Sequence, residues 1–480
     1  MSKKSFVFNL FWKFAERCGA QGVTFIVSVV LARLLEPELY GTIALVTVFI
    51  AILQVFVDSG LGNALVQKKD ADDVDFSSVF FFNLITCATL YFLMYFLAPI
   101  IADFYNMMEL VAVIRFMSLT LIVSGVKNVQ QAYVAKNMLF KKFFYSTVGG
   151  TIGAAVLGIF LAYKGYGIWA LAVQSVFNST VDTIILWFTV KWRPKKCFSI
   201  KRLLELFKYG WKLLVSALIE TGYTQLRTLI IGKIYSHEDL AYYSKADQFP
   251  SPVVTNINSS INSVLFPAMS KEQNDILRVR SMTRRSIKIS SYIMMPLMIG
   301  MAACADNLVE FILTDKWMPC VPYIRIFCFS YAFYPVHTAN LNAMNALGRS
   351  DLFLKLEIEK KIVGIIAIIA TVRFGVFIMA CSSIVCSIIN QIINSAPNKK
   401  LLGYSYKDQM LDICSSIILA SIMGVVVFLV GKIRMSCGYL LLTQIILGIV
   451  LYFVLSIVSK NENYKYIVSI VRDLQKRKGK

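Results

Sequence analysis

Charged and amide side chains occur at helical spacing inside apolar stretches of this sequence. In the first stretch, Lys13, Glu16, Arg17, Gln21, Thr24 and Ser28 fall within about 140° of one helix face at 100° per residue. A charge at the centre of a membrane helix costs roughly 2.5–3.5 kcal/mol, so such a stripe should face a wet cavity or a polar partner. The alternative for the two basic residues is that they reach the cytoplasmic headgroups, for which Gln21 lies too deep.

A second stretch repeats this pattern with Lys212, Glu220 and Arg227. Glu220 and Arg227 are seven residues apart and therefore nearly superposed on one helix face. Glu220 lies about 20 Å along a helix that starts near Phe207, close to the middle of a bilayer. We favour a pair that faces a cavity and serves a substrate or a coupling ion, and a structural salt bridge is the alternative.

Two further stretches, at 110–135 and 320–345, carry the same kinds of side chain. The outermost arginines of these stretches lie only about five residues from the outer end, so contact with headgroups competes with a function. The residues that we predict to line a hydrophilic cavity are Arg17, Gln21, Arg115, Lys127, Gln131, Lys212, Arg227, Arg325, His337 and Asn340, with Asp58 and Glu220 as candidates for ion coupling.

The predicted cavity residues lean basic, and Arg and Lys recognise phosphate better than they recognise a lipophilic cation. The sequence contains no Walker A, HExxH or GxGxxG motif, and neither His237 nor His337 has a Cys/His set at metal spacing nearby. We therefore predict no catalytic residues, no metal site and no bound ATP.

Composition indicates the elements that must hold these side chains. Of 480 residues, 57% are hydrophobic and 16% are charged, whereas soluble domains have roughly 45–50% and 25%. This balance excludes a soluble or a disordered chain and predicts an all-α protein with many membrane helices. We predict fourteen, at 10–34, 40–62, 77–102, 110–135, 143–163, 167–190, 207–232, 244–268, 286–304, 320–345, 354–374, 376–396, 409–431 and 438–459.

The distribution of basic residues supports this count. With the N-terminus inside, 30 Lys and Arg fall in predicted cytoplasmic segments and 7 in outer ones, as the positive-inside rule requires. Both ends should lie in the cytoplasm, and much of the net charge of +21 then reflects topology and not nucleic-acid binding. The basic tail from Lys460 is either a solvated end or an amphipathic helix on anionic lipid.

The ten cysteines are scattered through apolar runs without a CxxC pair, which predicts buried thiols and no disulfides. The N-terminal segment shows no signal-peptide pattern, so we expect the first helix to be retained.

The chain resembles itself at a shift near 200 residues, which pairs Trp12-Lys13 with Trp211-Lys212. A shift of 210 places Lys127 on His337. A unit of six helices returns the chain to the same side, so the halves would be parallel repeats. The predicted division is an N-lobe at 1–198, a C-lobe at 199–402, two accessory helices at 403–459 and a cytoplasmic tail at 460–480.

Several motifs together resemble one known family. They are LARLLEPELYG at 31–41, DSGLGNALVQK at 58–68, LIIGKIYSHEDLAYYSKA at 229–246, VLFPAMSKEQND at 264–275, DKWMP at 315–319 and NALGRSDLFLK at 345–355. The chain is similar to the polysaccharide-biosynthesis exporters of the multidrug/oligosaccharidyl-lipid/polysaccharide superfamily, in the branch of the Wzx-type flippases and the colanic acid and teichuronic acid exporters.

This resemblance implies two pseudo-symmetric six-helix lobes and two accessory helices. It also implies a bacterial inner-membrane flippase that moves an undecaprenyl-diphosphate-linked oligosaccharide by alternating access, driven by a proton or sodium gradient and without a cofactor. Implied partners are membrane lipids and, beyond them, a polysaccharide polymerase and glycosyltransferases. The family's cationic cavity residues would correspond to Arg17, Lys127, Lys212 and Arg227, with Glu220 and Asp58 coupling the ion.

Three other functions remain open. A multidrug/cation antiporter of the same superfamily predicts a net acidic cavity. A membrane-bound polymerase or ligase predicts a large outer loop with catalytic Arg or His. A structural scaffold would leave the deep charges without a physical reason.

Overall fold

The computed structural model describes residues 3–58, 60–433 and 435–478, without side chains for 3–18, 209, 350, 470–471 and 473–478. These residues form helices and no strand. The chain divides into two compact units, Met1–Ala241 and Tyr242–Lys480, which we call unit 1 and unit 2. An all-α protein is therefore confirmed.

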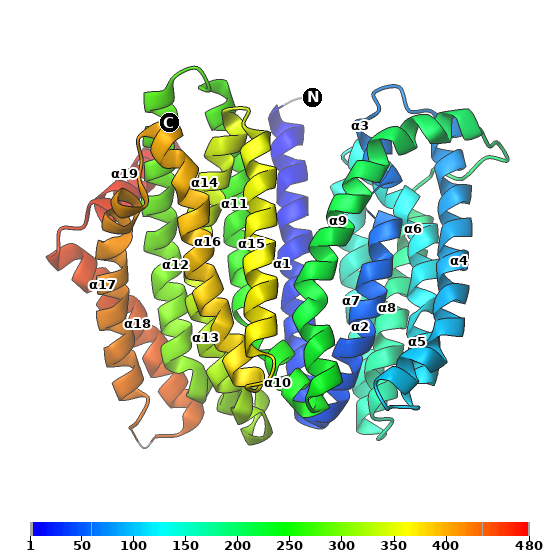
Figure 1. Ribbon diagram of the computed structural model, residues 1–480, viewed down its shortest axis with the longest axis horizontal. Coiled ribbons are helices and arrows are strands. Elements are labelled where there is room, and N and C mark those ends of the chain that lie inside the picture. The colour runs from blue at the N-terminus through cyan, green and yellow to red at the C-terminus, as the bar shows by residue number, and fades with distance from the viewer. Residues whose placement is uncertain (1–2, 59, 434, 479–480) are drawn as a thin grey trace. The chain divides into compact units, whose positions relative to one another are not determined.

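In the residues that the structure describes, unit 1 is a bundle of nine helices, α1 to α9, with α10 at its end (Figure 1). Helix α9 packs along α2, α3 and α4, and α7 lies between α1 and α8. The helices are α1 (Lys3–Leu34), α2 (Pro37–Asp58), α3 (Leu61–Gln67), α4 (Asp73–Phe104), α5 (Leu110–Met117), α6 (Leu119–Lys136), α7 (Phe140–Tyr163), α8 (Ile168–Thr189) and α9 (Ile200–Ile234), and α10 (His237–Asp247) spans the division between the units.

Unit 2 is built around its longest helix, α12, which packs on α13, α17 and α18. A short 3-10 turn, η1, precedes α13. The elements are α11 (Pro250–Lys271), α12 (Ile276–Leu313), η1 (Asp315–Cys320), α13 (Val321–Ala332), α14 (Tyr334–Ala346), α15 (Ser350–Thr371), α16 (Val376–Leu402), α17 (Tyr406–Val430), α18 (Cys437–Val458) and α19 (Glu462–Lys478).

Nine spans within the described residues are long and apolar enough to cross a membrane, by length and composition. The protein is therefore a multi-pass membrane protein. The predicted helices at 207–232, 244–268, 320–345 and 354–374 are also helical but carry too many polar groups to be among the nine. Fourteen crossings remain a prediction.

Four helices predicted as continuous are each divided between two helices, and these predictions were wrong in that respect. The range 110–135 breaks at Ser118, whose hydroxyl donates to the carbonyl of Ile114. The ranges 244–268 and 320–345 break just before Pro250 and Pro335, which lack an N–H for the preceding turn. The stretch 40–62 likewise ends as α2 and resumes as α3.

The order of helices repeats along the chain. Helices begin at Pro37, Phe140 and Ile168, and again at His237, Ser350 and Val376, with offsets of 200, 210 and 208 residues. Packing divides the chain elsewhere, because α9 belongs to unit 1 by its contacts with α2, α3 and α4. The predicted lobe boundary at 198 follows the repeat and stays a prediction.

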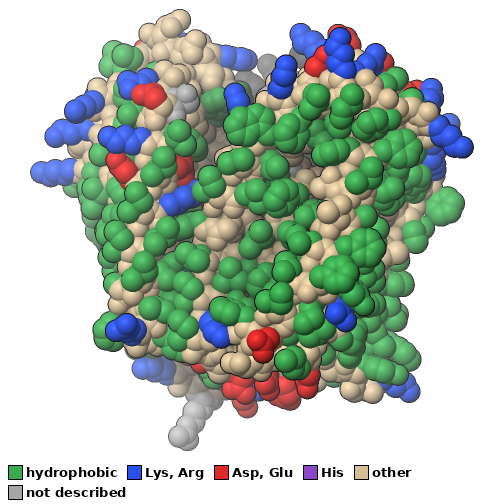
Figure 2. All heavy atoms as spheres, turned by 45° about the vertical axis from the view of Figure 1, so that its right-hand side comes forward, with side chains coloured by type: hydrophobic (Ala, Val, Ile, Leu, Met, Phe, Trp, Pro, Cys, Tyr) green, Lys and Arg blue, Asp and Glu red, His purple; other side chains and the backbone are tan. Residues whose placement is uncertain are grey.

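The surface of unit 1 has the distribution that a bilayer requires. On the face shown in Figure 2, hydrophobic side chains cover the middle, and charged side chains gather toward the upper and lower rims. The exposed apolar residues include Ile85, Phe92, Phe96 and Ile100 of α4 and Phe188 of α8. In water this much exposed apolar surface would aggregate, so these helices face lipid.

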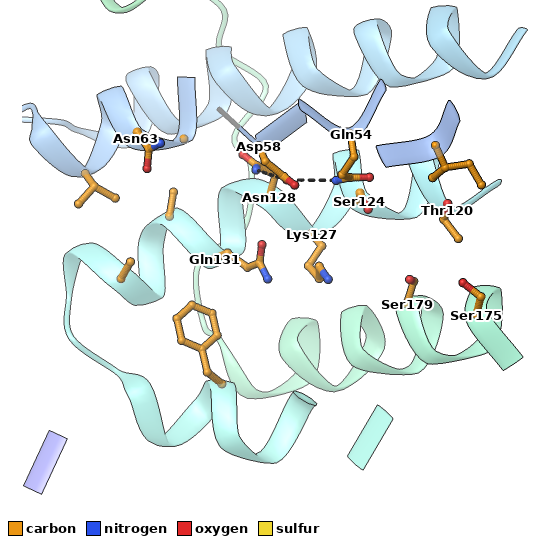
Figure 3. A pocket seen from close by; sticks show the side chains of 16 residues that line it. Gln54, Asp58, Asn63, Thr120, Ser124, Lys127, Asn128, Gln131, Ser175 and Ser179 are labelled. Carbon is orange, nitrogen blue, oxygen red and sulfur yellow. Dashed lines mark hydrogen bonds between the residues drawn. The ribbon is translucent and has the colours of Figure 1, made fainter. Parts of the chain in front are cut away.

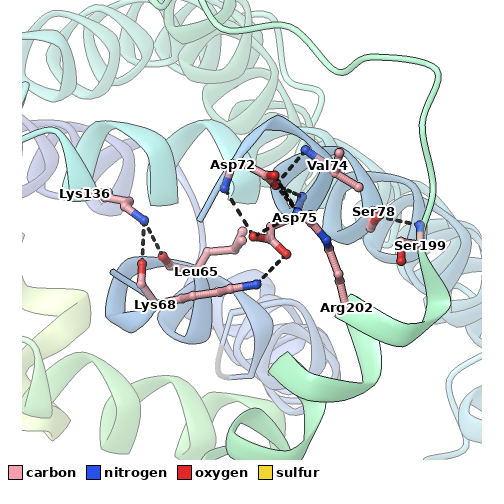
Figure 4. Close-up of polar contacts among 9 residues, drawn as sticks. All are labelled: Leu65, Lys68, Asp72, Val74, Asp75, Ser78, Lys136, Ser199 and Arg202. Carbon is pink, nitrogen blue, oxygen red and sulfur yellow. Dashed lines mark hydrogen bonds and ion pairs between the residues drawn. The ribbon is translucent and has the colours of Figure 1, made fainter. Parts of the chain in front are cut away.

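An ionic cluster fixes the start of α4 (Figure 4). Asp72 caps the helix by accepting from the backbone N–H of Val74 and Asp75, each at 3.1 Å. The carboxylate of Asp75 is fully buried and contacts Lys68 Nζ at 2.8 Å. Arg202, at the start of α9, lies 2.5 Å from Asp72 and 3.8 Å from Asp75. The cluster therefore ties the first turns of α4 and α9 together.

The segment between α8 and α9 is bound to the same end of α4. The backbone N–H groups of Lys195 and Ser199 donate to the hydroxyls of Ser77 and Ser78 at 3.0 and 2.9 Å. Lys195 Nζ also contacts Asp73 at 2.6 Å. Part of the basic charge that the positive-inside pattern collects here therefore serves to position helices.

The nine described cysteines are free thiols, and five of them are buried as predicted. The prediction was wrong for Cys414, which is exposed, and for Cys197, Cys381 and Cys437, which are half-buried. The tail forms helix α19, and the guanidinium of Arg285 lies 3.8 Å from the ring centroid of Tyr466. Binding of this helix to lipid remains one of the two alternatives.

Candidate functional site

A polar cavity of about 590 Å³ lies inside unit 1, between α2, α3, α6, α7 and α8 (Figure 3). We call it the unit 1 cavity. Lys127 and Gln131 reach it from α6, and Ser175 and Ser179 face them from α8. The lining residues are Ile50, Gln54, Asp58, Gly62, Asn63, Val66, Thr120, Ser124, Lys127, Asn128, Gln131, Ala132, Ala135, Phe143, Ser175 and Ser179.

Asp58, the last residue of α2, is held in the cavity wall by two amides. Its carboxylate accepts from Gln54 Nε2 at 3.1 Å and from Asn128 Nδ2 at 3.3 Å. The Asn128 side-chain oxygen in turn accepts from Asn83 Nδ2 on α4 at 3.3 Å. A relay of amides thus fixes the Asp58 carboxylate and links α2, α6 and α4.

A glycine permits this arrangement. A β-carbon at Gly62 would lie 2.9 Å from the side-chain oxygen of Asn128, closer than real β-carbons approach. The absence of a side chain at this position lets α3 approach α6 and leaves room for the amide beside Asp58.

Lys127 forms an ion pair with Asp182 of α8. The Nζ to Oδ2 distance is 3.1 Å, and the two side chains are 18% and 13% exposed. An ammonium with a carboxylate this close is largely neutralised. Lys127 therefore brings a polar group to the cavity but little free positive charge.

Other lining side chains are available to a ligand. Within the part of the chain that the structure describes, Asn63, Ser124, Gln131, Ser175 and Ser179 make no side-chain hydrogen bond to the protein. Hydroxyl and amide groups can each donate and accept. The cavity thus offers several open hydrogen-bonding positions beside its single carboxylate and its paired lysine.

Unit 2 contains a cavity of a different character. It measures about 480 Å³ and is lined mainly by apolar side chains of α12, α13 and α17, including Met298, Phe329 and Phe428. Arg325 also lines it, but this guanidinium is paired with Asp306 and donates through Nε to the carbonyl of Ala302 at 3.3 Å. This cavity suits apolar contacts more than recognition of a charged headgroup.

The other predicted residues of unit 2 belong to buried amide contacts. Asn340 donates to Gln409 Oε1 at 2.8 Å and accepts from Asn398 Nδ2 at 2.7 Å. Buried His337 lies 3.1 Å from the amide nitrogen of Asn394. These contacts join α14 to α16 and α17, so they hold helices together and do not line the cavity found in this unit.

Helix α9 carries three further charged residues that the sequence predicted for a cavity. Lys212 and Glu220 are exposed, and Arg227 is half-buried. Glu220, Arg227 and the half-buried Gln21 of α1 all engage in further interactions, so none of them is free. The side chain of Arg17 lies outside the described residues, and its predicted role stays a prediction.

Arg115 lies away from the unit 1 cavity. Its guanidinium stacks 4.0 Å from the ring centroid of Tyr95 and donates through Nε to the Tyr95 carbonyl at 3.2 Å. This contact with α4 accounts for the residue in structural terms.

Three predicted residues therefore meet in one cavity, namely Asp58, Lys127 and Gln131. Sequence reasoning missed Gln54, Ser175 and Ser179, because uncharged polar residues in membrane helices are common and carry no charge penalty that would single them out.

Membrane helices around a polar cavity are typical of proteins that bind a polar ligand at membrane depth. A model of the polysaccharide biosynthesis protein family matches residues 30–322, which is more than half of the chain. The protein therefore belongs to this family, and the resemblance seen in the sequence is confirmed. It is a multi-pass membrane protein of the polysaccharide biosynthesis family.

Individual relatives agree with this assignment. The chain is 24% identical over 386 residues to the teichuronic acid biosynthesis protein TuaB of Bacillus subtilis (strain 168), covering 78% of each chain. It is 24% identical over 331 residues to the succinoglycan biosynthesis transport protein ExoT of Rhizobium meliloti (strain 1021), covering 69% of this chain and 67% of that one.

A solved structure shares the fold. The lipid II flippase MurJ, in its inward closed conformation, matches with a TM-score of 0.75 over 95% of this chain and 99% of the other, at 17% identity. This likeness shows that the chain has the same fold.

Proposed function

We propose that this protein is a flippase that moves an undecaprenyl-diphosphate-linked oligosaccharide across the bacterial cytoplasmic membrane for surface polysaccharide synthesis. The observation that supports it most is a polar cavity of about 590 Å³ lined by membrane helices in a chain of the polysaccharide biosynthesis family. A glycan needs such a hydrated compartment, because its hydroxyls cannot enter hydrocarbon unpaired. The polyprenyl tail would stay in lipid.

The diphosphate would meet basic residues of α9. Lys212 is exposed and Arg227 half-buried on this helix, and both have the chemistry that recognises phosphate oxygens. Arg17 would add to this set by its position on α1. The two lobes would alternate between inward-open and outward-open states, and the substrate would shift their equilibrium only by its difference in affinity for the two.

A proton or sodium gradient would drive the cycle, with Asp58 and Glu220 as the coupling carboxylates. Asp58 supports this role by its place in the cavity wall, where amides hold the carboxylate without a direct ion pair in the described contacts. Polysaccharide polymerase and glycosyltransferases would act beside the flippase as partners, and both termini would lie in the cytoplasm.

Reconstitution tests the function. Full-length protein in liposomes should transfer an undecaprenyl-diphosphate oligosaccharide between leaflets, measured by access of an external glycosidase to the glycan. The double variant K212Q/R227Q should slow transfer at least tenfold, since each lost charge-assisted phosphate contact is worth about 1.5–3 kcal/mol. K201Q, at the start of the same helix, should keep the wild-type rate.

Two outcomes contradict the proposal. Liposomes in which the wild-type protein moves no lipid-linked glycan, but exchanges an organic cation such as ethidium for protons, would identify a multidrug antiporter. Synthesis of longer glycans from the same lipid would identify a polymerase. The short outer connections make the second outcome unexpected, since the seven residues from Thr314 to Cys320 are typical of them.

A further inference from the structure

We infer that the unit 1 cavity binds sugar rings of the transported lipid through their hydroxyls and does not bind its diphosphate. The inference rests on the proposed function and names the part of the substrate that this cavity takes. It follows from the charge, the hydrogen-bonding groups and the apolar wall of the cavity.

Charge argues against a diphosphate. Lys127 is the cation among the described lining residues, and its ammonium is already paired with Asp182 at 3.1 Å. Asp58 lines the same cavity. A diphosphate placed here would meet the Asp58 carboxylate and a lysine already neutralised by Asp182, and like charges at short range in a partly dehydrated site repel strongly.

The hydrogen-bonding groups suit a sugar. Hydroxyls both donate and accept, and the open groups of Asn63, Ser124, Gln131, Ser175 and Ser179 do the same. These groups come from α3, α6 and α8 and therefore surround the space from different sides (Figure 3). A ligand that carries hydroxyls around a ring would satisfy them together, whereas phosphate oxygens only accept.

The apolar part of the wall suits the ring itself. Phe143 of α7 lines the cavity beside Ala132, Ala135 and Val66. A pyranose has C–H faces as well as hydroxyl edges, and an aromatic ring with small aliphatic neighbours can cover such a face. The volume of about 590 Å³ lies within the roughly 300–1,000 Å³ of small-ligand sites.

Two lipid probes test this assignment in the reconstituted full-length protein. One probe is undecaprenyl diphosphate that carries a neutral oligosaccharide, and the other is undecaprenyl diphosphate without sugar. Q131L and S179A should each weaken binding of the glycosylated lipid about tenfold, as expected for a lost hydrogen bond with its desolvation cost. Binding of the bare lipid should be unchanged, and T180V, on α8 outside the cavity lining, should bind both lipids as wild type does.

Equal losses for both lipids would place the diphosphate in the cavity and overturn the inference. Unchanged binding of the glycosylated lipid in both variants would also overturn it. A wild-type protein that moves neither lipid would refute the proposed function. A second measurement would then still show whether the unit 1 cavity binds sugars or phosphate.

That measurement uses S179C, whose thiol would line the cavity. Alkylation of the peptide that contains position 179 is followed by mass spectrometry, with the wild-type peptide as the control. Free glucose, galactose or N-acetylglucosamine should slow the reaction, and inorganic pyrophosphate should not. Protection by pyrophosphate, or by none of these sugars, would overturn the assignment.

Discussion

Several charged side chains of the described helices are paired. Lys127 contacts Asp182, Arg325 contacts Asp306, and Lys68 contacts the fully buried Asp75. Such pairing lowers the cost of placing a charge at membrane depth. A buried lysine or arginine in a membrane helix is therefore a sign of a nearby carboxylate at least as much as of an anionic ligand.

The ion pair of Lys127 gives an asymmetric prediction. K127M leaves Asp58 and Asp182 without the cation and should destabilise the protein by about 3 kcal/mol, as breaking a buried pair does. D182N should cost less, because Lys127 keeps a carboxylate in the same cavity. Thermal unfolding in detergent measures both.

The double variant K127M/D182N provides the control. It removes both partners and should recover much of the stability lost in K127M. Equal losses in the two single variants, without recovery in the double variant, would show that the pair contributes little beyond packing.

At the scale of elements, the helices are positioned by polar contacts at their ends. The Asp72 cap and the Lys68 and Arg202 contacts position the start of α4 against α3 and α9, and the serine hydroxyls of α4 hold the segment between α8 and α9 (Figure 4). In unit 2, the amides of Asn340 and Gln409 hold α14 against α17. Because lipid cannot drive apolar faces together as water does, such contacts and close packing must specify helix positions.

The helix cap predicts a pH dependence. The hydrogen bond from Arg202 and that from the Asp75 backbone lower the pKa of Asp72 to about 2, below the usual 3.9 or so of the unfolded chain. A depressed carboxyl pKa stabilises the fold above the unfolded pKa and loses this effect as the pH falls through the folded one. The stability gap between wild type and D72N should thus be constant above about pH 5 and shrink toward pH 2.

Two variants separate the cap from the charge. Asn is as good an N-cap as Asp, so D72N removes only the charge, whereas D72A should cost a further 0.5–2 kcal/mol or so at every pH. Melting temperatures across the pH series measure both. A gap for D72N that stays the same down to pH 2 would contradict the ion-pair explanation.

At the scale of the whole molecule, the apolar surface defines a membrane protein, and the basic loops predict its orientation. Exposed aliphatic and aromatic side chains lie along α4, α15 and α18. Basic residues concentrate between α8 and α9 and in the tail, which the positive-inside rule assigns to the cytoplasm.

Orientation can be measured in cells. Single cysteines introduced at Gly165, between α7 and α8, should react with a membrane-impermeant maleimide added outside. Cysteines introduced at Lys196, between α8 and α9, or at Lys478 should react only after the membrane is permeabilised. External labelling of position 196 or 478 would reverse the predicted topology, and the unmodified protein controls for its native thiols.

The sequence alone determined the class of molecule, because hydrophobic content, helix length and basic-residue distribution are properties of local segments. It also led to the family, through motifs such as LARLLEPELYG. It predicted Asp58, Lys127 and Gln131 for a cavity, because a polar group inside an apolar helix is costly unless it faces water or a polar partner. The two prolines indicated the helix breaks before Pro250 and Pro335. The apolar run across each break nevertheless led to the prediction of one continuous helix.

Only the tertiary structure decided which charges are paired and which groups meet. Lys127 and Asp182 are 55 residues apart, and no spacing rule joins them. The same holds for Asn340 with Gln409, and for serines of α8 that face α6 across a cavity. Periodicity fixes the face of a helix on which a side chain lies, whereas its partner depends on how separate helices pack, and that is a property of the folded bundle.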